Sequence, residues 1–135
     1  MPKKVSDPKN KLSDFLTEEL IPMIQAAINC HIVGRVISYD KSRHVCDVQP
    51  LPLQSDKDKR AALTECVVPA SIWQTDEAMV ALKAPDYKKM KVGSVVWIGY
   101  CDREMDNWTG SSNYQLESKR MHSLQDPVVE AVIKP

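Results

Sequence analysis

The segment Val95-Val96-Trp97-Ile98-Gly99-Tyr100-Cys101 is followed directly by Asp102-Arg103-Glu104-Met105-Asp106-Asn107-Trp108. The first segment is rich in β-branched and aromatic residues, which predicts a buried strand over 94–101. The second is charged and ends in an aromatic residue, a composition typical of a loop that folds back over the end of a strand. We therefore expect 94–101 to be a central strand and the charged segment to close one end of its sheet.

Four other segments also have the composition of strands. They cover residues 31–39, 44–51, 63–69 and 128–133. A polar turn over 40–43 predicts that the first two of them form a hairpin. Residues 70–92 leave alternatives open, because 71–73 could extend the third strand and 78–82 could be a strand or a helical turn.

The order of these segments decides the fold class. About five strands without alternating helices exclude a doubly wound fold. We predict a mainly β protein, a five-stranded antiparallel barrel of the oligonucleotide/oligosaccharide-binding (OB) type. A small sandwich is the alternative. The expected organisation is a flexible leader over 1–10, an N-terminal amphipathic α-helix over 11–29 and the barrel domain over 30–135.

The predicted N-terminal helix has one apolar face. Its residues recur at steps of three and four, as in an amphipathic helix. Pro22 interrupts the pattern, so we expect a kink or a break there. The apolar face either covers the open end of the barrel or packs against a copy of itself in an assembly. The candidate interface residues are Leu12, Phe15, Leu16, Leu20 and Ile24.

The composition limits the function. Among 135 residues, 18 lysines and arginines balance 18 aspartates and glutamates, so no basic excess indicates stable binding of nucleic acid. A chain without net charge associates readily, as a subunit of an assembly does. No apolar run is long enough to span a bilayer, and residues 1–7 lack the features of a signal peptide. We therefore expect synthesis in the cytoplasm.

The candidate reactive groups favour structural roles. The cysteines lack the paired spacing of a zinc site, so we expect them to be buried without metal or disulfide. Asp102, Glu104 and Asp106 could serve a hydrolase if two of them converged on a cleft, but Arg103 and Arg120 lie near enough in sequence to neutralise them. We expect a structural charge network, no catalytic residue, no cofactor and no enzyme activity.

The chain resembles the N-terminal OB domain of phage central-spike and baseplate-hub proteins. The similar segments span roughly residues 30–133. They are Gly34-Arg35-Val36-Ile37-Ser38-Tyr39-Asp40, Val45-Cys46-Asp47-Val48-Gln49-Pro50, Val67-Val68-Pro69, Val92-Gly93-Ser94-Val95-Val96, Asp102-Arg103-x-x-Asp106-x-Trp108 and Arg120-x-His122-Ser123-Leu124-x-Asp126.

The resemblance implies a virion structural protein of the phage tail, a homotrimer on the tail axis that joins hub or tube to the tip. Its expected partners are baseplate-hub, tail-tube and spike-tip proteins, with no small-molecule substrate. The chain has no repeat for a β-helical needle, so we expect another chain to supply the piercing tip. The alternative function is a single-stranded nucleic-acid-binding OB protein.

The charged segments are predicted to brace the barrel. Trp108 should cover the barrel end with its ring. Arg120 and Asp126 should fix the return into the last strand through charge-assisted hydrogen bonds. The full set of predicted structural residues is Asp102, Arg103, Asp106, Trp108, Arg120, His122 and Asp126.

Overall fold

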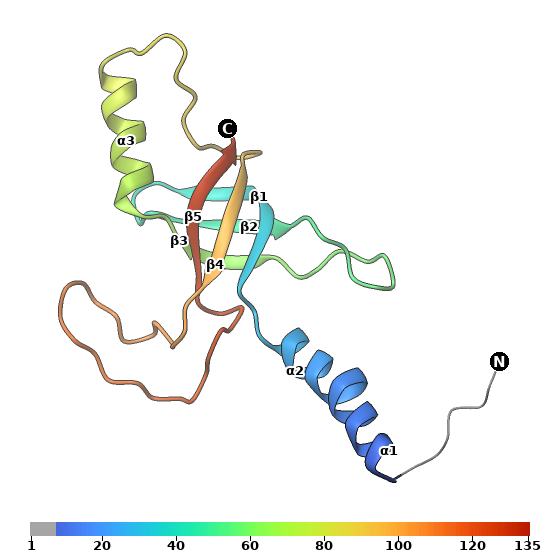
Figure 1. Ribbon diagram of the computed structural model, residues 1–135. Coiled ribbons are helices and arrows are strands. Elements are labelled where there is room, and N and C mark those ends of the chain that lie inside the picture. Colours follow the sequence, from blue (N-terminus) through green and yellow to red (C-terminus); the bar gives the residue numbers. More distant parts are fainter. Residues whose placement is uncertain (1–7) are drawn as a thin grey trace.

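The computed structural model describes residues 8–135, and it is a five-stranded closed β-barrel with a projecting N-terminal helix (Figure 1). The elements in chain order are α1 (Pro8–Asp14), the π-helix η1 (Phe15–Leu20), α2 (Ile21–Ala27), β1 (His31–Asp40), β2 (Val45–Pro50), β3 (Leu63–Val67), α3 (Ala70–Ala81), β4 (Val95–Tyr100) and β5 (Pro127–Lys134). The predicted mainly β, OB-like barrel is therefore confirmed.

The strands follow one another around the barrel in the order β1-β2-β3-β5-β4. The long strand β1 pairs with β2 and, through its first half, with β4. Both of these pairings are antiparallel, as are β2 with β3 and β4 with β5. The barrel is mixed rather than wholly antiparallel, because β3 and β5 run parallel and meet in register at Val67 and Val128.

The core lies inside the barrel. Alternate residues of the strands point inward, as the period of a strand requires. Val48, Val96, Ile98 and Val129 have no exposed surface. Burying each such side chain contributes about 1.5–3 kcal/mol relative to leaving it in water. The complete buried apolar set is Val36, Cys46, Val48, Leu63, Cys66, Val68, Met90, Val96, Ile98 and Val129.

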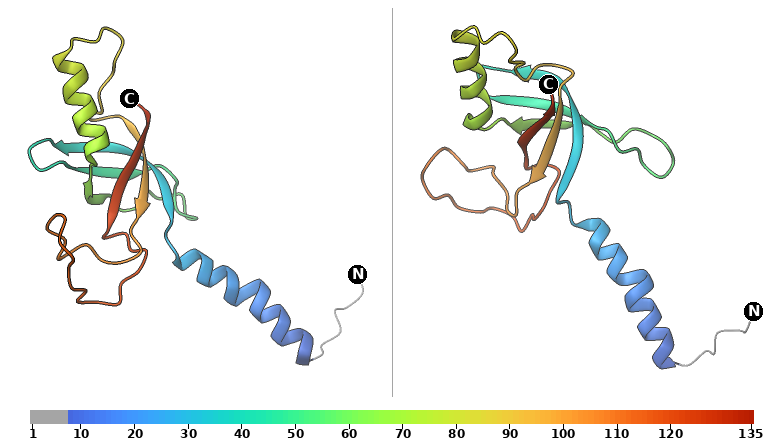
Figure 2. Two further views of the ribbon diagram at one scale, coloured as in Figure 1. Left: turned by 60° about the vertical axis from the view of Figure 1, so that its left-hand side comes forward. Right: turned by 45° about the horizontal axis from the view of Figure 1, so that its top comes forward.

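Residues 70–81 form the helix α3 between β3 and β4, and this resolves the ambiguity of the sequence there. Neither strand interpretation of 71–73 or 78–82 is correct. The helix packs on one side of the barrel (Figures 1 and 2), where Ile72 and Trp73 contact the core. Pro69 immediately precedes the helix as its N-cap residue and has an extended backbone.

The N-terminal helix begins at Pro8, three residues earlier than predicted, and runs through α1, η1 and α2 to Ala27. Most of the predicted leader, residues 1–7, lies outside the described residues. Pro22 lies inside α2, which follows η1 directly, so the predicted kink or break takes another form. The π-helix η1 ends at Leu20, two residues before the proline. It contains Glu18, the residue four positions before Pro22. This wider turn accommodates the missing donor and the crowded carbonyl.

Candidate functional site

Residues 101–126 form a long loop that leaves β4 and returns to β5 (Figure 1). Glu104 is the centre of its first half, and its side chain is only 1% exposed. One carboxylate oxygen accepts hydrogen bonds from the backbone N–H groups of Glu117 and Ser118, and the other accepts the Ser118 hydroxyl at 2.6 Å. These hydrogen bonds lower the pKa of Glu104, and the bond from the Ser118 hydroxyl has the largest effect.

Arg120 ties the second half of the loop to the start of β5. Its guanidinium donates to Asp126 at 2.8 and 2.9 Å, which is a two-point contact with a carboxylate that is 1% exposed. It also donates to Asp106 at 2.9 Å. The hydrogen bonds to these two carboxylates raise the pKa of Arg120, and Asp126 has the larger effect. Asp126 in addition accepts the backbone N–H of Met105 at 3.1 Å.

His122 links the loop to the base of the N-terminal helix. Its Nε2 lies 3.2 Å from an Asp102 carboxylate oxygen, and its carbonyl accepts a hydrogen bond from Asn29 at 2.9 Å. Its backbone N–H donates to the carbonyl of Cys101. Asp102 and Arg103 pair with each other at 3.1 Å on the surface. The structure therefore brings together six of the seven predicted bracing residues in two groups.

Trp108 is the exception, and its predicted place over the barrel end is wrong. Its side chain is 46% exposed, and its indole N–H donates to the carbonyl of Gly110 within the loop. Its backbone N–H bonds to Met105, so the residue stabilises a local turn. Glu104 has the central position instead. The sequence analysis named Glu104 among the carboxylates of a charge network but not among the bracing residues, because its donors lie 13 and 14 residues along the chain.

This loop holds its acidic groups in a structural arrangement. Glu104, Asp106 and Asp126 each accept hydrogen bonds from side chains of the same loop, as the predicted structural charge network requires. Within residues 8–135, no three His, Cys, Asp or Glu side chains are grouped in a way that could hold a metal ion.

The cysteines divide into two groups. Cys46 and Cys66 are buried cross-strand partners in the core, as predicted, and both are free thiols. The contact with Cys46, together with burial, raises the pKa of the Cys66 thiol, which makes it a poor nucleophile. Cys101 is half-buried, and Cys30 is exposed, so the expectation that every cysteine is buried is wrong.

The predicted interface residues lie on the projecting helix, and they do not cover the barrel. No residue of α1, η1 or α2 is buried. Leu12 is 60% exposed, Phe15 50% and Ile24 50%, while Leu16 is exposed and Leu20 half-buried. The helix extends away from the barrel in every view (Figures 1 and 2). The first alternative, a helix packed over the open end of its own barrel, is therefore wrong.

The π-helical segment aligns this apolar face. Leu12, Leu16, Leu20 and Ile24 follow one another at a constant step of four residues. In an α-helix of about 3.6 residues per turn, each such step drifts sideways by about 40°. A π turn closes through wider i→i+5 bonds, so η1 takes back part of that drift in the middle of the helix. The exposed face is thus a straighter stripe than the spacing alone would give.

Models of known protein families give no match to this chain, and no curated protein matches it at a significant level. The resemblance to phage spike and hub domains therefore remains a prediction. No helix in the described part of the chain is both long and apolar enough to cross a membrane.

Proposed function

We propose that the protein is a structural assembly module of a phage tail, located in the baseplate or central spike. In this proposal the OB-like barrel self-associates as a homotrimer on the tail axis and joins hub or tube proteins to the tip. The proposal assigns no catalytic reaction to the barrel, and it places function on surfaces.

The exposed apolar stripe of the N-terminal helix is the observation that carries the proposal. Most helical stability in proteins comes from packing an apolar face against another surface. Here that face makes no buried contact within the chain. A contiguous exposed apolar surface of this kind typically marks a protein–protein interface. Copies of the same stripe around an axis would supply the missing contacts.

The arrangement of the two ends supports an axial role. The helix leaves the barrel at the end where the 101–126 loop lies, whereas the C-terminus lies at the other end beside α3 (Figure 1). The hydrogen bond from Asn29 to His122 fixes the helix base to that loop. A rigid barrel with different structures at its two ends suits a component that is stacked between two different neighbours.

Sedimentation velocity of two matched variants tests the proposal. Phe15→Glu places a charge in the apolar stripe, and Gln25→Glu places the same charge on the polar side of the same helix. Both positions are exposed within the chain, so neither change disturbs a buried contact. We expect the wild type and Gln25→Glu to sediment as trimers and Phe15→Glu as a monomer.

A Phe15→Glu variant that keeps the wild-type trimer mass would contradict the assigned interface. A monomeric wild type at every concentration would contradict the assembly role. Salt-sensitive binding of the wild type to single-stranded oligonucleotides would favour the nucleic-acid-binding alternative instead.

A further inference from the structure

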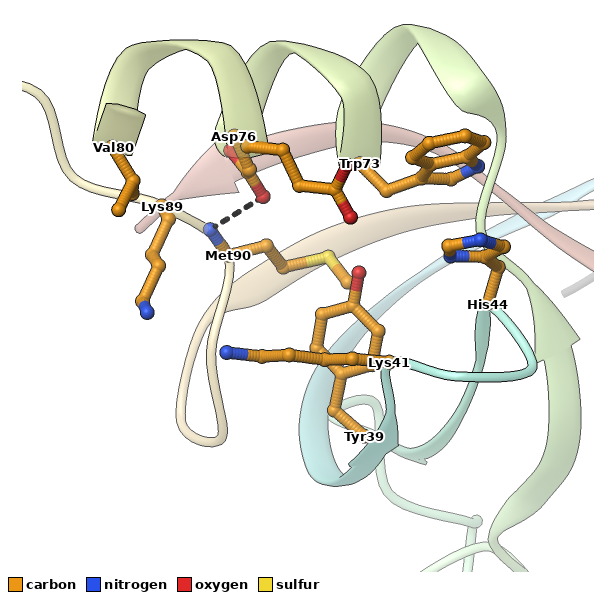
Figure 3. A pocket seen from close by; sticks show the side chains of 9 residues that line it. Tyr39, Lys41, His44, Trp73, Asp76, Val80, Lys89 and Met90 are labelled. Carbon is orange, nitrogen blue, oxygen red and sulfur yellow. Dashed lines mark hydrogen bonds between the residues drawn. The ribbon is translucent and has the colours of Figure 1, made fainter. Parts of the chain in front are cut away.

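A second feature is independent of the helix, namely a pocket between α3 and the turn that joins β1 to β2 (Figure 3). Its volume is about 120 Å³. A buried apolar cavity of about 150 Å³ can hold a benzene molecule, so this somewhat smaller pocket has room for a branched aliphatic group. Sequence reasoning did not identify it, because its walls come from three separate segments, which include His44, Trp73 and Lys89.

One end of the pocket is aromatic and apolar. His44 and Trp73 stack with ring centroids 4.0 Å apart and planes inclined by 8°. The Met90 side chain and the Tyr39 ring lie beside them toward the middle of the pocket (Figure 3). His44 has a positive φ of 54°, an uncommon conformation for a non-glycine residue, and it turns the chain at this wall.

The other end carries two like charges. The side chains of Lys41 and Lys89 extend on the same side of the pocket (Figure 3), and the Lys89 ammonium lowers the pKa of Lys41. Neither lysine forms an ion pair within the described chain. Two adjacent ammonium groups repel each other, and an anion placed between them would relieve that repulsion.

The acidic side chains of the pocket restrict which anion can enter. Asp76 is engaged by the Tyr87 hydroxyl and by the backbone N–H of Met90 at 3.1 Å. Glu77 also lines the pocket, so its lining carries two carboxylates beside the two lysines. These carboxylates would repel a second negative charge on the ligand. The fit is therefore to a single carboxylate at one end of a compact apolar body.

The geometry points to a binding site for a monocarboxylate with a small apolar body, whose carboxylate lies between Lys41 and Lys89 and whose apolar part lies against Trp73 and Met90. This chemistry has two sources, a free small molecule or the carboxyl end of a polypeptide with an apolar last residue. The site does not depend on the proposed self-association, since none of its residues belongs to the N-terminal helix.

Titration of the full-length protein followed by NMR tests the site. The probe is N-acetylleucine, and N-acetylleucinamide is the matched neutral control. We expect N-acetylleucine to shift the Trp73 indole N–H resonance saturably and the amide to bind about tenfold more weakly or not at all, as for loss of a charge-assisted contact. The variant Trp73→Phe assigns the resonance.

A double variant, Lys41→Met with Lys89→Met, keeps the apolar stems and removes the charges. It should weaken N-acetylleucine binding about tenfold, whereas Lys59→Met in the distant 51–62 loop should leave it unchanged. Both lysines are exposed, so the double variant should fold normally.

Two results would overturn the inference. One is the absence of a saturable shift at Trp73, and the other is equal binding by the wild type and the double-lysine variant. A tetrapeptide ending in leucine with a free carboxyl group separates the two sources. Markedly tighter binding of the peptide than of N-acetylleucine assigns the site to a polypeptide end, and equal or weaker binding assigns it to a small molecule.

Discussion

At the scale of single residues, Glu104 is the side chain on which the 101–126 loop depends. Its carboxylate accepts three hydrogen bonds from residues 117 and 118, and these keep it charged although it is buried. A lowered pKa means that the folded state favours the ionised form. Its stabilising effect is therefore complete above the ordinary pKa of 4.5 and is lost as the pH falls through the lower, folded value.

We expect Glu104→Gln to lower the melting temperature at neutral pH, because the amide cannot accept the same set of hydrogen bonds. The difference from wild type should shrink as the pH falls below 4.5, because the unfolded wild-type carboxylate is protonated first and the folded one only at its lower pKa. Thermal unfolding over a series of pH values measures this. Parallel curves for the two proteins across the whole range would show that Glu104 is not the group that titrates.

Two glycines in the sheet provide a matched comparison. A Cβ on Gly34 would overlap Val48 in the core and lie 3.2 Å from the backbone oxygen of Gln49. A Cβ on Gly99 would instead meet the Glu130 side chain, which is half exposed and can move away at the cost of its ion pair with His31. Overpacking a core costs about 2 kcal/mol, and loss of an exposed ion pair costs less than about 1 kcal/mol.

We therefore expect Gly34→Ala to lower the free energy of unfolding by about 2 kcal/mol and Gly99→Ala by less than about 1 kcal/mol. Urea unfolding of both variants measures the difference. Equal losses would mean that β1 and β2 can separate enough to admit the methyl group, contrary to the close approach seen at Gly34.

The sequence also had limits at this scale. Spacing and charge placed Arg120 and Asp126 in one brace, since a guanidinium and a carboxylate six residues apart can close a turn. They could not place Trp108. An aromatic residue in a polar loop is buried only if the loop folds over the barrel, and here the loop packs around Glu104 instead.

At the scale of elements, the barrel strands followed from composition, whereas α3 did not. Each strand is rich in β-branched residues, and the observed bounds lie within about two residues of the predicted ones. In α3 the only buried residue is Asp76, an acid, so the helix lacks the apolar stripe that would have identified it. Ile72 and Trp73 also favour strands in isolation, and the tertiary contacts override that preference.

Asp76 explains why this helix is held in place despite its weak apolar face. Its carboxylate binds the Tyr87 hydroxyl and the Met90 backbone N–H, and thereby ties α3 to the segment that leads into β4.

We expect Asp76→Ala to lower the free energy of unfolding by about 2 kcal/mol, since it leaves a buried N–H without a partner. In this variant, the backbone amides of residues 70–90 should exchange hydrogen faster than in the wild type, while those of the barrel strands change less. Uniform quickening would show that α3 is not a separate unit.

At the scale of the whole molecule, the barrel and the N-terminal helix differ in where their apolar side chains pack. The barrel closes on itself around its own core. The helix has an apolar stripe and no buried residue, and under our proposal copies of the chain cover that stripe. The sequence indicated the stripe, but it could not show that the helix projects. That outcome depends on the direction of the chain between Ala27 and His31.

The mass of the intact, purified protein by native mass spectrometry tests the central claim most directly. The account predicts a main species at three times the chain mass of 15.2 kDa, because the stripe on each helix is covered by its copies. A main species at 15.2 kDa over the whole accessible concentration range would contradict it.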